Sequence, residues 1–184
     1  MTTDKSSSEP ANEGGRLTAA GIFAVAHATG EDELKRSPAG LALSGLAAGL
    51  GMGLTGLGAA SILAAVGPDA PGVHLLTALL YPIGFIVVVL GRAQLFTENT
   101  LFPVLVVLAT KRHIVYTLRL RGIVFAANIV GALLFALLAI MTPALSAELR
   151  EALSALGEQT VGTGDFWHIF FSGIIGGWII ALMA

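Results

Sequence analysis

The sequence predicts an all-α integral membrane protein. Of its 184 residues, 55% are hydrophobic and only 12% are charged, a composition typical of membrane proteins rather than of soluble domains. Long apolar stretches alternate with polar segments, and the longest stretches are sufficient to cross a bilayer as helices. One polar decapeptide, residues 91–100, interrupts an apolar run where the flanking sequence is typical of membrane.

The composition also argues against several classes of function. A net charge of −2 argues against a nucleic-acid partner, and the absence of cysteine excludes structural disulfides and thiolate chemistry. The four histidines are scattered without the spacing of metal ligands, so we expect no metal and no cofactor. No paired nucleophile and base stand out, so we do not expect an enzyme. The histidines are His27, His74, His113 and His168.

We expect residues 1–37 to form a cytoplasmic N-terminal tail that contains a short amphipathic helix at the membrane surface. This helix is predicted over residues 17–28, a segment too short to span the bilayer. Its apolar face would consist of Leu17, Ile22, Phe23 and Val25. Gly30 should end the helix, and residues 31–36 should form a solvated, charged link to the next element.

Residues 38–184 are predicted to form the transmembrane domain, and the first span covers residues 39–66. Pro38 suits the first turn of this helix, and the span itself contains no charged residue. A smooth stripe is left on one helix face by Gly45, Gly49 and Gly53. The stripe favours a helix–helix or subunit contact, although glycine is also common in membrane helices that make no such contact.

The second span is predicted to be discontinuous. After a turn over residues 67–72, it would occupy residues 73–110, which as one straight helix would be roughly 55 Å long against a bilayer core of ~30 Å. A break at residues 91–100 resolves this mismatch. Irregular polar backbone at membrane depth has to line a cavity or be covered by protein, so the break is the expected functional site.

The third and fourth spans are predicted over residues 114–142 and 166–184, with a polar segment, residues 143–165, between them. Positive charge precedes the first span and separates the second from the third, which predicts a cytoplasmic N terminus. The residues concerned are Lys35, Arg36, Lys111, Arg112, Arg119 and Arg121. Because the sequence ends at Ala184 inside an apolar run, we expect it to be a fragment of a longer protein.

Two motifs resemble the formate/nitrite transporter family. The first is the segment that interrupts the second span, Arg92-Ala93-Gln94-Leu95-Phe96-Thr97-Glu98-Asn99. The second lies in the third span, where Asn128 is followed after two residues by Gly131 and Ala132. The resemblance implies an aquaporin-like helical bundle of two inverted three-helix repeats, of which this chain would supply the first repeat and a fourth helix.

The resemblance also implies a function and a cellular location. Members of the family assemble as pentamers with one pore in each subunit, and they pass small monovalent anions such as formate or nitrite. The version of the loop found here is similar to a bacterial inner-membrane subgroup. The expected partners are therefore a small anion, the lipid bilayer and further copies of the chain.

The resemblance assigns roles to the residues of the break. Leu95 and Phe96 would form the pore constriction, and the hydroxyl of Thr97 would face the substrate chamber. Unwound backbone N–H groups would offer further hydrogen-bond donors to an anion. The remaining loop candidates are Gln94, Arg92, Glu98 and Asn99, and the structural or pore-near candidates are Gly91 and Asn128.

Three questions stay open at this point. Arg92 could pair with Glu98 and pin the loop, or extend to the cytoplasmic face and attract anions there. Asn128 could line the pore or hydrogen-bond a neighbouring helix. The family has an acidic residue at the position of Gln94 and a pore histidine that none of the four histidines matches. Because most of the second inverted repeat is missing from this sequence, the alternative function is a non-conducting membrane assembly or scaffold protein that keeps the fold.

Overall fold

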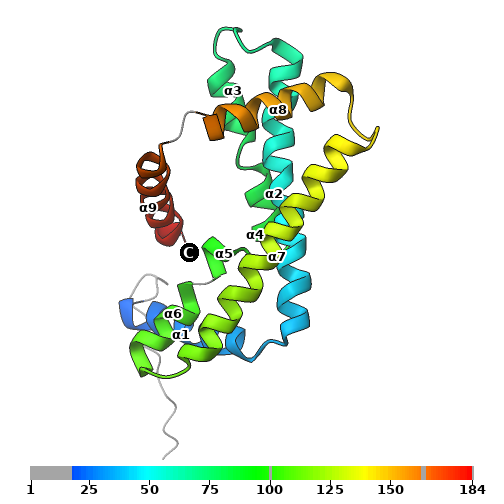
Figure 1. Ribbon diagram of the computed structural model, residues 1–184. Helices are drawn as coiled ribbons and strands as arrows, with labels where there is room; N and C mark the ends of the chain where they lie inside the picture. Colours follow the sequence, from blue (N-terminus) through cyan, green and yellow to red (C-terminus); the bar gives the residue numbers. More distant parts are fainter. Residues whose placement is uncertain (1–17, 100, 163–164, 184) are drawn as a thin grey trace, which may run out of the picture.

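The computed structural model describes residues 18–99, 101–162 and 165–183, and every regular element within them is a helix (Figure 1). Three helical segments are long and apolar enough to cross a membrane: α2 (Pro38–Val66), residues Val73–Leu90, and α7 (Ile114–Met141). Most of their surface is uncovered within the chain, as expected for helices that face lipid or other helices. The prediction of an all-α membrane protein is confirmed.

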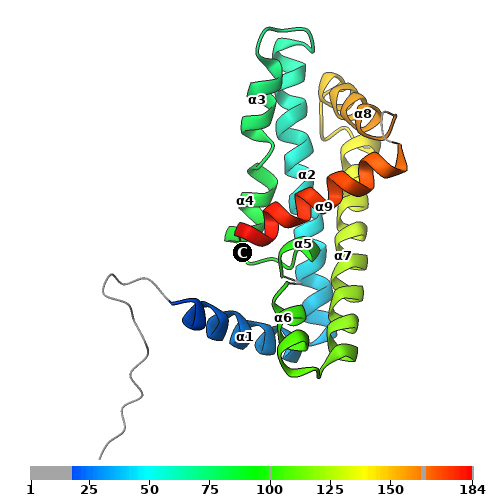
Figure 2. The ribbon, with the colours of Figure 1, turned by 90° about the vertical axis from the view of Figure 1, so that its left-hand side faces the viewer.

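The N-terminal helix α1 (Ala19–Lys35) is longer than predicted. Thr18 caps its start, since the Thr18 hydroxyl accepts a hydrogen bond from the Gly21 N–H at 3.1 Å. Gly30 does not end the helix, because it lies where α1 crosses α6 (Leu101–Thr110), and a Cβ at Gly30 would meet Val106. The expected charged link over residues 31–36 is therefore wrong: its first five residues are helical. Figure 2 shows α1 lying across the foot of the long helices.

The glycine stripe of α2 packs against α7 of the same chain. A Cβ on Gly45 would lie 2.9 Å from the Cβ of Ala127, and one on Gly49 would overlap the backbone of Asn128. Gly53 faces an aromatic ring of α7 in the same way. The absence of side chains on one face therefore lets the two helix axes approach closely. The expected helix–helix contact is present.

The second arm of the bundle consists of several pieces. It starts with α3 (Val73–Leu80) and α4 (Ile83–Leu90), is interrupted, and continues with α5 (Phe96–Asn99) and α6. A continuous helix over residues 73–110 is thus excluded, as predicted. The additional kink between α3 and α4 was not predicted. It falls at Pro82, which has no N–H to donate to the preceding turn.

Two helices follow α7. The segment expected to be a polar loop contains α8 (Ala147–Gly162), which packs on α2 through half-buried side chains that include Leu149, Leu153 and Leu156. Their spacing could have revealed this helix. The last helix, α9 (Phe166–Met183), lies to one side of the long helices in Figure 1, is inclined to them in Figure 2, and contacts α5. Its described apolar part is shorter than the membrane-crossing helices, so the fourth span stays a prediction.

The start of α8 carries a pH-sensitive contact. Hydrogen bonds from its own backbone N–H and from the Ser146 hydroxyl lower the pKa of the Glu148 carboxyl below its ordinary value. A lowered pKa in the folded state stabilises the fold fully above the unfolded value, and that contribution is lost as the pH falls through the folded value. We expect amide exchange in the first turn of α8 to accelerate below about pH 4, after correction for intrinsic rates.

Hydrogen–deuterium exchange on the wild type and on Glu148→Gln measures this effect. The glutamine variant should exchange at one corrected rate from pH 6 to pH 3.5. An equally strong acid response in both proteins would show that Glu148 does not cause it.

Candidate functional site

The break in the second arm lies level with the middle of α7, as both ribbon views show (Figures 1 and 2). We call residues 91–95, between α4 and α5, the break loop. Its turn begins where Arg92 adopts a left-handed backbone conformation, with φ of 50°. The Arg92 N–H still donates to the Val89 carbonyl at 3.0 Å, and the Ala93 N–H donates to the Val88 carbonyl at 3.0 Å. After that turn the backbone no longer bonds to α4, and other elements have to satisfy it.

Asn128 of α7 holds the break loop. Its Oδ1 accepts from the Phe96 N–H at 2.9 Å, while its Nδ2 donates to the Gln94 carbonyl at 2.9 Å and to the Gly45 carbonyl at 2.8 Å. The side chain thus connects α7, α2 and the loop through backbone groups only. This geometry favours the hydrogen-bonding interpretation of Asn128 over a pore-lining one.

Gln94 is held from two further directions. Its backbone N–H donates to the Ser44 hydroxyl at 3.1 Å, and its Nε2 donates to Oε2 of Glu33 at 2.9 Å. Gln94 is only 1% exposed, and its Oε1 is buried without a partner. Glu33 was missed as a candidate, because the sequence gives no sign that α1 extends as far as the break loop.

The two predicted constriction residues point into different parts of the core. Leu95 is 7% exposed and belongs to an upper cluster with Ala48 and Val88. Phe96 is half-buried against a lower cluster, which consists of Leu34, Leu41, Val106, Leu120 and Val124. The Phe96 ring also meets Phe125 edge-on, with ring centroids 5.1 Å apart. Of the two, Phe96 therefore presents the larger free surface at the break.

A cation lies directly at the Phe96 side chain. The guanidinium carbon of Arg121, on α7, is 4.9 Å from the centroid of the Phe96 ring, within the range of a cation–π contact. Arg121 was predicted only as part of the basic segment that orients the chain. Its position one helical turn before Phe125 brings it to the same ring.

The remaining candidate residues do not form one cluster with Gln94 and Phe96. Thr97 is exposed on α5, and Glu98 is partly exposed with Oε2 buried and without a hydrogen-bond partner. Arg92 is exposed and makes no ion pair with Glu98, so the proposed pairing is wrong for this structure. In the described part of the chain, ion pairs join Lys35 to Asp32, Arg36 to Glu33 and His27 to Glu31. The Asn99 side chain and Thr100 lie outside the described residues.

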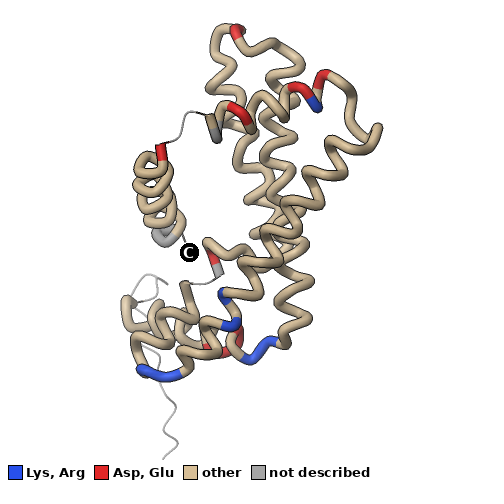
Figure 3. The backbone as a smooth tube through the Cα atoms, viewed as in Figure 1, with Lys and Arg blue, Asp and Glu red and all other residues tan. Residues whose placement is uncertain are grey.

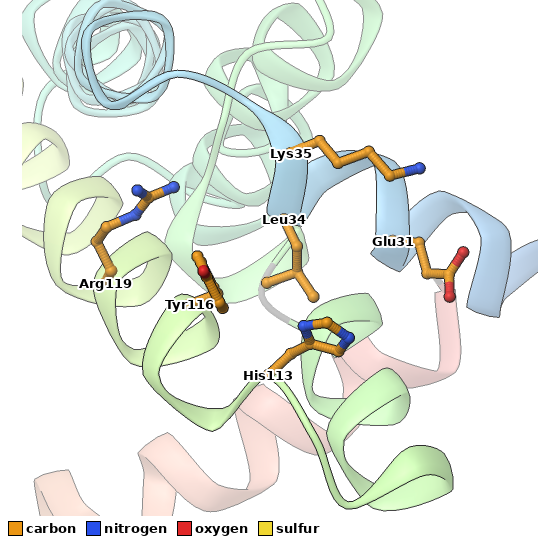
Figure 4. Close-up of a pocket in the computed structure, with 6 residues that line it drawn as sticks. All are labelled: Glu31, Leu34, Lys35, His113, Tyr116 and Arg119. Carbon is orange, nitrogen blue, oxygen red and sulfur yellow. The ribbon is translucent and has the colours of Figure 1, made fainter.

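A separate cavity lies near the foot of the bundle. It has a volume of about 490 Å³, and Figure 4 shows its lining: Glu31, Leu34, Lys35, His113, Tyr116 and Arg119. The Lys35 and Arg119 side chains extend on opposite sides of it (Figure 4). The break loop contributes none of these six residues, so the candidate site and this cavity are distinct.

Charge is distributed unevenly along the molecule. Figure 3 shows most Lys and Arg residues at the end formed by α1 and the connection from α6 to α7. Acidic residues predominate at the other end, around α8 and the connection from α2 to α3. The charge pattern read along the sequence therefore corresponds to two opposite ends of the fold.

Comparison with known proteins agrees with this architecture. Residues 20–184 match the formate/nitrite transporter family. The chain is also 38% identical over 156 residues to "Inner membrane protein YfdC" of Escherichia coli (strain K12), which covers 84% of this chain and 50% of that protein. The chain thus spans about half the length of the curated relative that it matches. With a match over this much of its length, the chain belongs to the formate/nitrite transporter family.

Proposed function

We propose that the full-length protein passes small monovalent anions, such as formate or nitrite, across the bacterial inner membrane at the break in the second arm. Family membership supports transport of this substrate class, and the relative named above is an inner membrane protein. The observation that carries the proposal is the Arg121 guanidinium, held 4.9 Å from the ring centroid of Phe96 at the unwound segment.

The break offers a passing anion only a few hydrogen-bond donors. An anion in an apolar constriction carries a large desolvation cost unless it is paired or hydrogen-bonded. The backbone N–H groups of Gln94 and Phe96 are already bonded to Ser44 and Asn128, so the expected supply of free loop N–H groups is smaller than predicted. In the proposal, the Thr97 hydroxyl and Arg121 supply the favourable contacts.

In the proposal, some residues of the break line the anion path and others hold the loop in place. Phe96 narrows the path, while Leu95, buried between α2 and α4, supports the wall from behind. Gln94 and Asn128 fix the loop, Gly91 and Arg92 form its start, and Glu98 follows it on α5. Oε2 of Glu98 is buried without a hydrogen-bond partner, so in the proposal this carboxyl group hydrogen-bonds a passing substrate.

The orientation and assembly belong to the same proposal. The basic end of the molecule, near α1, would face the cytoplasm under the positive-inside rule. The exposed apolar side chains of α7 and α9 would contact lipid or other subunits of a pentamer.

The proposal is tested by anion flux into liposomes that contain the full-length protein. Formate, nitrite and hydrosulfide uptake should exceed that of empty liposomes for the wild type. Phe96→Ala should raise the rates several-fold and reduce discrimination by size, because the aromatic wall is removed. Phe23→Ala makes the same chemical change at an exposed position of α1 and should leave both quantities unchanged.

One result would remove the transport interpretation. If the wild type gives no more flux than empty liposomes for any of the three anions, the alternative of a non-conducting membrane scaffold stands instead.

A further inference from the structure

We propose that Glu33 is a positioning residue for the break loop. From the helix α1 it holds, through Gln94, the segment that carries Leu95 and Phe96. This inference rests on the proposed function, because it assigns Glu33 a role in setting the same constriction. Glu33 acts through another side chain and is not assigned a contact with the substrate.

The contact between Glu33 and Gln94 joins parts of the chain that are far apart in sequence. Oε2 of Glu33 accepts from Nε2 of Gln94 at 2.9 Å, across 61 positions. The Gln94 residue is 1% exposed and the Glu33 side chain is 20% exposed, so water has little access to the bond. A hydrogen bond to a charged group in such surroundings is strong, and its loss leaves a buried amide without a partner.

The carboxylate is itself held in place from the other side. Nη1 of Arg36 lies 3.3 Å from the same Oε2 atom, and the Arg36 backbone N–H donates to the Glu33 carbonyl at 3.2 Å. The neighbouring Leu34 is buried in the lower cluster and fixes the rotation of α1. The end of α1 and the break loop therefore form one connected unit.

The bond has a direction that depends on both residue types. Gln94 donates and Glu33 accepts, so an acid at position 94 would place two carboxylates against each other. Exchanging the two residues would restore one donor and one acceptor. This relation provides a test that simple removal of either side chain cannot give.

The test measures access to the loop in the full-length protein. Residues 1–184 contain no cysteine, so Leu95→Cys, at a position of the break loop that is only 7% exposed, reports on the loop alone once any cysteine elsewhere is replaced. The rate of its modification by a small maleimide is compared in four backgrounds: Glu33→Ala, Gln94→Glu, the double variant Glu33→Gln with Gln94→Glu, and Asp32→Ala. Asp32 is the matched control, because it lies on the same helix and its 79% exposed carboxylate bonds only Lys35 in the described residues.

A defined pattern of rates is expected. Glu33→Ala and Gln94→Glu should raise the modification rate about tenfold, while the exchanged double variant should return to within about twofold of the parent. Asp32→Ala should have no effect. Equal rates for Glu33→Ala and Asp32→Ala would overturn the proposal, and so would a double variant that reacts as fast as Gln94→Glu alone. If Glu33→Ala fails to fold, the labelling rates of Gln94→Glu and of the double variant still test the proposal.

The ratio of two anion fluxes distinguishes a positioning role of Glu33 from a merely structural one. In liposomes, fewer folded molecules would lower the uptake of formate and of a larger monocarboxylate in proportion, whereas a displaced loop changes their ratio. We expect the ratio to shift towards the larger anion in Gln94→Glu and to recover in the double variant. An unchanged ratio would overturn the positioning role. If the wild type shows no flux at all, the proposed function fails, and the labelling pattern alone decides on the contact.

Discussion

Replacing Asn128 by alanine is expected to lower the free energy of unfolding by about 3 kcal/mol, with about 1 kcal/mol for each of three lost hydrogen bonds. The loss is large because the partners are backbone groups of the break loop and of α2, which lie within the bundle. No nearby side chain can replace an amide that donates twice and accepts once.

Thermal unfolding of the full-length protein in lipid nanodiscs measures this loss. Ser44→Ala is the matched control, since it removes a single hydrogen bond to the same loop and should cost about 1 kcal/mol. Asn128→Asp keeps an acceptor for the Phe96 N–H and loses both donated bonds. If water solvates the added charge, its loss of unfolding free energy should lie between the losses of Ser44→Ala and Asn128→Ala. Equal losses for Asn128→Ala and Ser44→Ala would refute the central role of Asn128.

Replacing Gly49 by leucine is expected to prevent the protein from assembling. A Cβ at this position would overlap the backbone oxygen of Asn128, and backbone cannot be moved aside by a change of rotamer. Gly131 faces the same contact from α7, where a Cβ would lie 2.8 Å from the Leu50 backbone nitrogen. The two helices would have to separate, with a cost of about 3 kcal/mol or more.

Fluorescence-detected size-exclusion chromatography tests this expectation through the yield of monodisperse protein. Gly122→Leu is the control, because it inserts the same side chain into α7 at a position with no neighbouring atoms within 4 Å of the added Cβ. Its yield should match the wild type. If both leucine variants lose protein equally, membrane insertion rather than close packing limits the yield.

Several parts of the fold follow from simple properties of the sequence. The lengths of the apolar runs predict α2 and α7 to within a residue or two, because a helix in lipid has to match the bilayer thickness. The same length argument predicts the break, since an uninterrupted helix over residues 73–110 would be too long. The four-residue spacing of Gly45 and Gly49 predicts a close helix contact, and the structure identifies α7 as the neighbour.

The rest depends on contacts that have no local signature. Gly30 looks like a helix terminator in the sequence, but it is a crossing point for α6, and only the tertiary arrangement distinguishes the two. Glu33 belongs to a run of charges that is typical of a solvated segment, yet its partner lies far along the chain. The pairing of Arg92 with Glu98 was one of two interpretations, since an arginine at membrane depth is expected to need a partner. Arg92 is instead exposed, and the ion pairs among the described residues do not include it.

The division of the core between Leu95 and Phe96 has a mechanical consequence. Leu95 packs with Ala48 of α2 and with α4, whereas Phe96 packs with the lower cluster, which contains residues of α1, α6 and α7 and the start of α2. The two halves of the second arm therefore pack against different clusters of the core, and a single peptide bond joins Leu95 to Phe96. Any movement of one half relative to the other concentrates at the Leu95–Phe96 peptide, which then acts as a hinge. Asn128 restrains this hinge, because its Oδ1 accepts the hydrogen bond of the Phe96 N–H.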